Sequence, residues 1–266
     1  MSAISVRNVW VEYGDQIVLE RINLEIAAGT FLSVVGPSGA GKSTFLRLIL
    51  GQERPTRGTI LLDGTPLPPE PGPDRGVVFQ RYSVFPHLTV LGNVLIGFEF
   101  AASKLLARLT GAARRAAIEK SEELLAAVGL APHRDKFPSA LSGGMQQRLA
   151  IAQALARAPR VLLLDEPFGA LDPGTRAQMH ALVTPLWRQH KMTVIMVTHD
   201  IKEAFGLATR LVALDRWRRD PQAPGRFGAV VTYDLDLTRE TPVPVLRFSR
   251  PIDANGGASQ RQGGPQ

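Results

Sequence analysis

A glycine-rich run at residues 36–44 constrains the fold of this chain more than any other segment. Its sequence fits the pattern Gly, four residues, Gly-Lys-Ser, and it stands between apolar stretches at residues 31–35 and 45–50. The pattern indicates a phosphate-binding loop between a buried strand and a helix, because glycines let successive backbone N–H groups turn toward phosphates. Lys42 would supply a charge to the terminal phosphates, and Ser43 a hydroxyl ligand for Mg²⁺. The predicted phosphate loop comprises Gly36, Pro37, Ser38, Gly39, Ala40, Gly41, Lys42, Ser43 and Thr44.

Hydrophobic periodicity predicts an α/β fold. Alternating patterns at residues 4–13 and 17–26 are typical of an antiparallel β layer. Short apolar runs without alternation are typical of strands buried on both faces of a parallel sheet. They occur at residues 31–36, 76–80, 161–165, 193–198 and 211–214.

The long interval before residue 161 has helical character. Residues 90–109, 112–128 and 142–158 predict helices, so we expect a helical insertion at about residues 84–158. Ser142 can cap the last of these helices and leave the backbone amides of Gly143 and Gly144 as an anion site. After about residue 237 the chain is rich in Pro, Gly and Gln, which predicts a tail at residues 238–266 that is disordered toward its end.

Composition excludes several classes of protein. The 266 residues include no cysteine, which removes disulfides, thiolate metal sites and cysteine nucleophiles. No run reaches the roughly 18 to 20 apolar residues of a membrane span, and the N-terminus has no signal-peptide pattern. The net charge of +7 permits binding to nucleic acid or anionic lipid, but the basic residues lack interleaved aromatics and a nucleic-acid motif. A solvated basic surface is the favoured interpretation, and no nucleic-acid partner is expected.

Two adjacent carboxylates follow the apolar run at residues 161–164. Asp165 matches the strand-end aspartate that holds Mg²⁺ in nucleotide-binding sites. Glu166 can orient and deprotonate an attacking water, although an exposed cap at a strand end is the alternative reading. The phosphate loop favours the catalytic reading.

The run Leu-Ser-Gly-Gly-Met-Gln-Gln-Arg at residues 141–148 resembles the signature motif of ATP-binding cassette (ABC) ATPases. All the motifs of that family occur in family order over residues 1–237. The resemblance implies a P-loop NTPase core with an antiparallel β subdomain and an inserted α-helical subdomain, forming one ABC ATPase domain over residues 1–237. It also implies ATP hydrolysis with Mg²⁺.

Further site residues are implied by this resemblance. Tyr13 would stack on adenine, Gln80 would sense Mg²⁺ and the lytic water, and His199 would contact the γ-phosphate. Asp172 would communicate across a dimer interface. Tyr13 also shares a strand face with Val9 and could be core instead. The remaining histidines match no catalytic position and are interpreted as surface or loop residues; they are His87, His133, His180 and His190.

In this family the signature of one subunit closes over the ATP of the other, so Ser142, Gly143 and Gly144 imply a dimer with two nucleotides between the subunits. The chain has Met145 where Gln is commonest and Gln153 where Arg is usual. Because Ser142 and backbone amides build the anion site, neither departure is expected to abolish activity.

Residues 80–90 resemble the segment that contacts the membrane subunit in ABC importers. Phe85 is then a docking residue, with a place in the core of the helical insertion as the alternative. The chain looks most like ATPase subunits of the nitrate, taurine and alkanesulfonate importer group. The resemblance implies a peripheral location on the cytoplasmic face of the membrane, transmembrane permease partners and, indirectly, a solute-binding protein. An exporter ATPase and a soluble ABC protein acting on nucleic acid or ribosomes are the rival readings, and no residue identifies the cargo.

Overall fold

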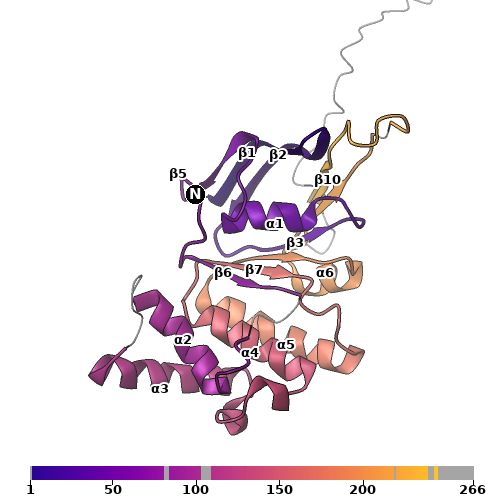
Figure 1. The fold of residues 1–266 in the computed structure, drawn as a ribbon. Helices are drawn as coiled ribbons and strands as arrows, with labels where there is room; N and C mark the ends of the chain where they lie inside the picture. Colours follow the sequence, from indigo (N-terminus) through magenta and orange to yellow (C-terminus); the bar gives the residue numbers. More distant parts are fainter. Residues whose placement is uncertain (1, 81–83, 103–108, 219, 239–242, 245–266) are drawn as a thin grey trace, which may run out of the picture.

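The computed structural model describes residues 2–80, 84–102, 109–218, 220–238 and 243–244 (Figure 1). Two β-sheets and a group of helices form three layers. The smaller sheet is antiparallel and has the strand order β2-β1-β4-β5. Its strands are β1 (Ser2–Tyr13), β2 (Gln16–Ala27), β4 (Arg57–Leu62) and β5 (Thr65–Pro66).

The larger sheet has the order β11-β10-β9-β3-β8-β7-β6. Strands β9, β3, β8, β7 and β6 run parallel, whereas β10 and β11 add antiparallel strands at one edge. The parallel strands are β3 (Phe31–Val35), β6 (Arg75–Val78), β7 (Val161–Asp165), β8 (Thr193–Val197) and β9 (Arg210–Asp215). The added strands are β10 (Val230–Asp236) and β11 (Val243–Pro244).

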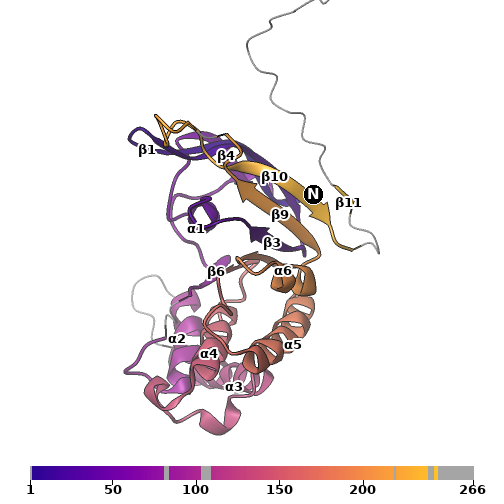
Figure 2. The same ribbon diagram turned by 90° about the vertical axis from the view of Figure 1, so that its right-hand side faces the viewer.

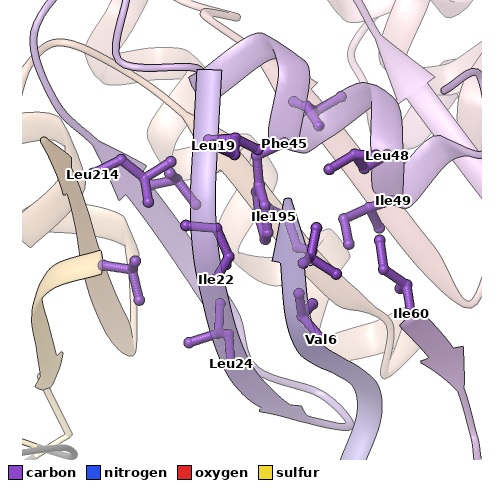
Figure 3. Packing of buried hydrophobic residues seen from close by; sticks show 14 of the residues in the cluster. Val6, Leu19, Ile22, Leu24, Phe45, Leu48, Ile49, Ile60, Ile195 and Leu214 are labelled. Atoms are coloured by element: carbon purple, nitrogen blue, oxygen red, sulfur yellow. The ribbon is translucent and has the colours of Figure 1, made fainter. Parts of the chain in front are cut away.

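Helix α1 (Lys42–Leu50) lies between the two sheets (Figure 1). Apolar side chains from both sheets surround its buried face, and Figure 3 shows Phe45 and Leu48 of α1 among Leu19, Ile60 and Ile195. Burying large apolar side chains stabilises the fold by about 1.5 to 3 kcal/mol each. This core fixes the start of α1, and therefore the phosphate loop, relative to both sheets.

The other helices cover the opposite face of the larger sheet (Figures 1 and 2). They are α2 (Val90–Ala102), α3 (Gly111–Ala127), α4 (Gly143–Leu155), α5 (Pro173–His190) and α6 (Ile201–Leu207), with short 3₁₀ turns at Ala131–His133 and Pro138–Ala140. A second apolar cluster joins α4 and α5 to the parallel strands. No helix within the described ranges is long and apolar enough to cross a membrane.

The predicted α/β architecture is confirmed. Hydrophobic periodicity did not predict β10, because the polar residues Thr232 and Asp234 interrupt its apolar pattern. Asp234 is nevertheless 1% exposed. The guanidinium of Arg210 on β9 donates to both carboxylate oxygens of Asp234, at 2.7 and 2.6 Å. Two residues of the predicted tail, Val243–Pro244, form β11, and residues 245–266 lie outside the described ranges.

We predict that Asp234→Ala lowers the free energy of unfolding by about 3 kcal/mol, because the change leaves the largely buried Arg210 guanidinium without its carboxylate. Urea unfolding followed by circular dichroism measures the loss. Arg226→Ala is the matched control, since Arg226 forms an exposed ion pair with Asp220 and should change stability by less than about 1 kcal/mol. Equal losses in the two variants would contradict the role given to the buried pair.

Candidate functional site

The phosphate loop connects the end of β3 to the start of α1. Gly36 has φ 154°, and a Cβ atom there would lie 2.2 Å from the carbonyl oxygen of Leu214 on β9. Only glycine fits at such a distance. Gly41 precedes α1 in the left-handed conformation and offers no side chain to cap it. The first N–H groups of α1 thus remain available to an anion.

Lys42 folds back over the loop. Its Nζ donates to the carbonyl oxygens of Gly36 and Pro37, at 2.9 and 3.0 Å, and the residue is 8% exposed. An ammonium group has three N–H donors, so one remains for a phosphate oxygen. The two carbonyl contacts hold the charge at the loop rather than in solvent.

Asp165, at the end of β7, lies beside the start of α1. The hydroxyl of Ser43 donates to Asp165 Oδ1 at 3.3 Å. Burial raises the pKa of Asp165 above its ordinary value, and the Glu166 carboxylate adds to the effect while the bond from Ser43 opposes it. A carboxylate next to a hydroxyl is a donor set that suits Mg²⁺, which takes few protein oxygens and completes its shell with phosphates and water.

Three residues predicted to act together converge at the ends of neighbouring strands. Glu166 follows β7, His199 follows β8 and Gln80 follows β6. His199 Nδ1 lies 3.5 Å from Glu166 Oε1, and Gln80 Nε2 donates to Glu166 Oε2 at 3.4 Å. Glu166 has φ 44°, a left-handed conformation that is unfavourable for a residue with a side chain and is commonest at functional sites.

A polar network holds the segment that carries His199. The hydroxyl of Thr198 donates to the buried carboxylate of Glu203, which also lies 3.4 Å from His180 Nε2. Asp200 caps α6 by accepting from the backbone N–H groups of Lys202 and Glu203. These contacts restrict the backbone on both sides of His199.

His180, interpreted from the sequence as an ordinary surface or loop residue, is partly exposed but lies on a helix rather than in a loop. This half-buried side chain lies on α5, contacts Glu203 and packs edge-on against the ring of Phe168 at 5.2 Å. Sequence reasoning also missed Glu203. Neither residue belongs to a local motif that could have identified the contact, because the two lie on separate helices.

The phosphate loop and the convergent residues open into one cavity of about 480 Å³. It brings together Lys42, Ser43, Glu166 and His199 from distant parts of the chain. Asp165 and Gln80 adjoin it through their bonds to Ser43 and Glu166. The lining residues are Gln16, Val18, Ser38, Gly39, Gly41, Lys42, Ser43, Thr44, Glu166, His199 and Arg216.

Tyr13 lies outside this lining. It is 47% exposed, so a place in the core is wrong, and its hydroxyl hydrogen-bonds to Glu53 beyond α1. Glu53 in turn pairs with Arg47 at 3.2 Å. Stacking of Tyr13 on adenine stays a prediction.

The signature residues also lie away from the cavity. Ser142 caps α4, accepting from the backbone N–H of Met145 at 3.4 Å, and Gly144 packs so closely that a Cβ there would lie 2.5 Å from Thr175 Cγ2. Asp172 caps α5, and hydrogen bonds from the side chain and backbone of Thr175 lower its pKa. Within the described residues, the cavity of a single chain therefore lacks the anion site at α4.

The fold and this cavity define a nucleotide-binding P-loop cassette. A profile of the ABC transporter family matches residues 19–169, and the chain belongs to that family. It is 42% identical to the nitrate import ATP-binding protein NrtD of Synechocystis, over 86% of this chain and 80% of that protein. It is 45% identical to the bicarbonate transport ATP-binding protein CmpD of the same organism, over 89% of this chain and 81% of that protein.

Solved structures of ATP-binding cassettes have the same fold. The dimeric, post-hydrolysis structure of the cassette MJ0796 with ADP and Pi superimposes with a TM-score of 0.70. The superposition covers 89% of this chain and 99% of the MJ0796 chain, and the sequence identity is 30%. The predicted ABC ATPase fold and family are confirmed.

We predict that Asp165→Asn raises the melting temperature of the nucleotide-free protein at pH 7. Burial disfavours the Asp165 carboxylate, whereas asparagine is uncharged and can still accept from Ser43. Because burial raises the pKa of this acid on folding, the destabilisation is absent below the unfolded pKa of about 3.9. It grows as pH rises from there toward the folded pKa and is complete above it. Thermal melts from pH 4 to 8 should show a gain that grows with pH; a gain independent of pH would contradict this origin.

Proposed function

We propose that this chain is the ATP-hydrolysing subunit of an ABC importer and that it dimerises on ATP to drive solute uptake through a separate permease. The observation that carries the proposal is the convergence of Glu166, Gln80 and His199 on the cavity that contains the phosphate loop. The names of NrtD and CmpD describe import and bicarbonate transport, which favours import over export or a soluble role.

In this proposal the loop amides, the N-terminus of α1 and Lys42 bind the phosphates of ATP. Ser43 and Asp165 would hold Mg²⁺, with Gln80 nearby through its bond to Glu166. When bound, Mg²⁺ would neutralise charge on the phosphate oxygens. Glu166 accepts the proton of the attacking water, and its neighbours Gln80 and His199 fix the orientation of its two oxygens.

The separation of the signature from the cavity supports a composite site. A second copy of the chain would bring Ser142, Gly143 and Gly144 to the phosphates, with Asp172 at the interface. The N-terminus of α4 suits this role, because a serine cap leaves backbone N–H groups facing an anion. The structure of MJ0796 with ADP and Pi is dimeric, which supports assembly of two copies of this chain.

A groove beside the helical subdomain is the proposed docking site for the permease. Phe79, Phe85 and Phe100 contribute to its wall, and its volume is about 240 Å³. Phe85 is half-buried and lies outside the three buried apolar clusters of the described residues. The side chain of Asn93, which is 0% exposed, bonds both the N–H and the carbonyl of Phe85, at 2.7 and 3.0 Å, and so fixes its position. Residues 81–83 of the predicted docking segment lie outside the described ranges.

We further propose that the ATPase domain spans residues 1–237 and that residues 238–266 form a separate tail. We also propose that the subunit lies on the cytoplasmic face of the membrane. A solute-binding protein completes the proposed importer. The location and the solute-binding protein follow from the proposed docking to a permease.

We predict that Glu166→Gln leaves ATP binding intact and lowers the rate of ATP hydrolysis by about 10² to 10⁴. Glutamine keeps the shape of the side chain and deletes the base. The variant should elute as a dimer in gel filtration with ATP and as a monomer without it. Near-normal turnover would refute the catalytic role of Glu166.

Two further variants separate binding from assembly. Lys42→Ala should instead weaken ATP binding itself, because a phosphate loses its charged donor. Ser142→Arg, placed in the Glu166→Gln background, should bind ATP and remain a monomer, because the exposed α4 cap would be blocked. A dimer that tolerates this arginine would exclude the composite site.

Phe85→Ala should leave the melting temperature and the ATPase activity of the isolated subunit unchanged. It should weaken binding to the permease at least tenfold, since losing an aromatic anchor typically costs about 2 kcal/mol. Co-purification from detergent and cargo uptake measure the effect. The matched control is Phe137→Ala, an exposed aromatic elsewhere in the helical subdomain, which should retain binding. A destabilised Phe85→Ala subunit that still binds permease would place Phe85 in the core.

A further inference from the structure

The segment between β9 and β10, residues 216–229, lies against the start of β2. Three backbone hydrogen bonds join them: Ile17 N to Gly225 O at 2.8 Å, Glu20 N to Ala229 O at 2.9 Å and Ala229 N to Val18 O at 2.9 Å. Glu20, which is 4% exposed, also accepts from the backbone N–H of Gly228 at 3.1 Å. The segment is therefore held beside two cavity-lining residues, Gln16 and Val18.

Three arginines of this segment are described, and two of them are paired with carboxylates. Arg218 pairs with Glu20, and Arg226 pairs with Asp220 at 3.3 Å. Arg216 forms no ion pair within the described ranges. Its Nη2 donates to the carbonyl of Ile17 at 3.4 Å, and its buried Nε has no hydrogen-bond partner there.

Arg216 is also the arginine that lines the phosphate cavity. It lies in the wall of an adjacent hollow of about 420 Å³ as well, together with Pro37, Ser38, Gly39 and Ala40 of the phosphate loop. The bond to Ile17 places the guanidinium on the β2 side of the cavity, next to Gln16 and Val18. Arg218 and Arg226 already have carboxylate partners, whereas Arg216 has none within the described ranges. A phosphate bound at the loop would give the Arg216 guanidinium an anionic partner.

We propose that Arg216 is an additional ATP-binding residue, whose guanidinium contacts the phosphate chain from the β2 side of the cavity. This inference rests on the proposed function. A guanidinium is always charged, and its planar set of N–H donors matches phosphate oxygens better than an ammonium does. Arg216 and Lys42 then hold the nucleotide from different parts of the chain, the segment after β9 and the start of α1. The contact involves binding alone and requires no part of Arg216 in the chemical step.

Titration of the full chain with a fluorescent methylanthraniloyl derivative of ATP tests the proposal, with unlabelled ATP and adenosine as competitors. Arg216→Ala should weaken ATP binding about tenfold and leave adenosine binding unchanged. Arg216→Lys, which keeps the charge without the planar fork, should lie between wild type and alanine. The matched control is Arg226→Ala, which removes the same charge from the same segment outside the cavity and should bind ATP normally.

The outcomes separate this inference from the proposed function. If wild type fails to bind the probe, the proposed function fails. If wild type binds and a folded Arg216→Ala protein binds equally well, Arg216 is no ATP contact. An equal loss for ATP and adenosine, or an equal loss in Arg226→Ala, would also overturn the phosphate contact. Melting curves without nucleotide confirm folding of each variant, and Arg216→Lys carries the test should the alanine variant unfold.

Discussion

The close approach of Gly36 to the carbonyl of Leu214 is the constraint on which the site depends. Because no side chain fits between them, β3 and β9 come together at their ends and the phosphate loop must turn away from the sheet. That turn starts α1 under the smaller sheet and folds Lys42 onto the loop carbonyls. It also brings Arg216, two residues beyond Leu214, to the wall of the same cavity. The contact between Gly36 and Leu214 thus helps to position three groups that can bind an anion: the N-terminus of α1, Lys42 and Arg216.

The cavity concentrates unfavourable local features that the surrounding core tolerates. Burial raises the pKa of Asp165, Glu166 has a left-handed backbone, and the Nε of Arg216 has no partner in the described structure. A bound Mg²⁺-nucleotide would relieve the first and the third of these features, the buried charge of Asp165 and the unpartnered nitrogen of Arg216. The apolar clusters on both sides of the larger sheet hold these groups in place. Such concentration is typical of sites whose groups are positioned before the ligand arrives.

Much of the fold was predictable, because the parallel strands, the phosphate loop and the helices have local patterns. The approach of Glu166 to His199 was also predictable, since parallel strands place their ends at one edge of a sheet. Strand β10 was not, because its buried Asp234 is recognisable only beside Arg210. The contact of His180 with Glu203, and the place of Arg216, likewise depend on elements far apart in the sequence. No short stretch of the sequence contains both residues of such a contact.

The hydrogen bonds between residues 225–229 and β2 have a mechanical consequence. They tie β10, and through it the edge of the larger sheet, directly to the smaller sheet on the side away from the helices (Figure 2). Force applied to the smaller sheet therefore passes into β9 and β3 without crossing the phosphate loop. The two sheets should accordingly move together as one body around α1.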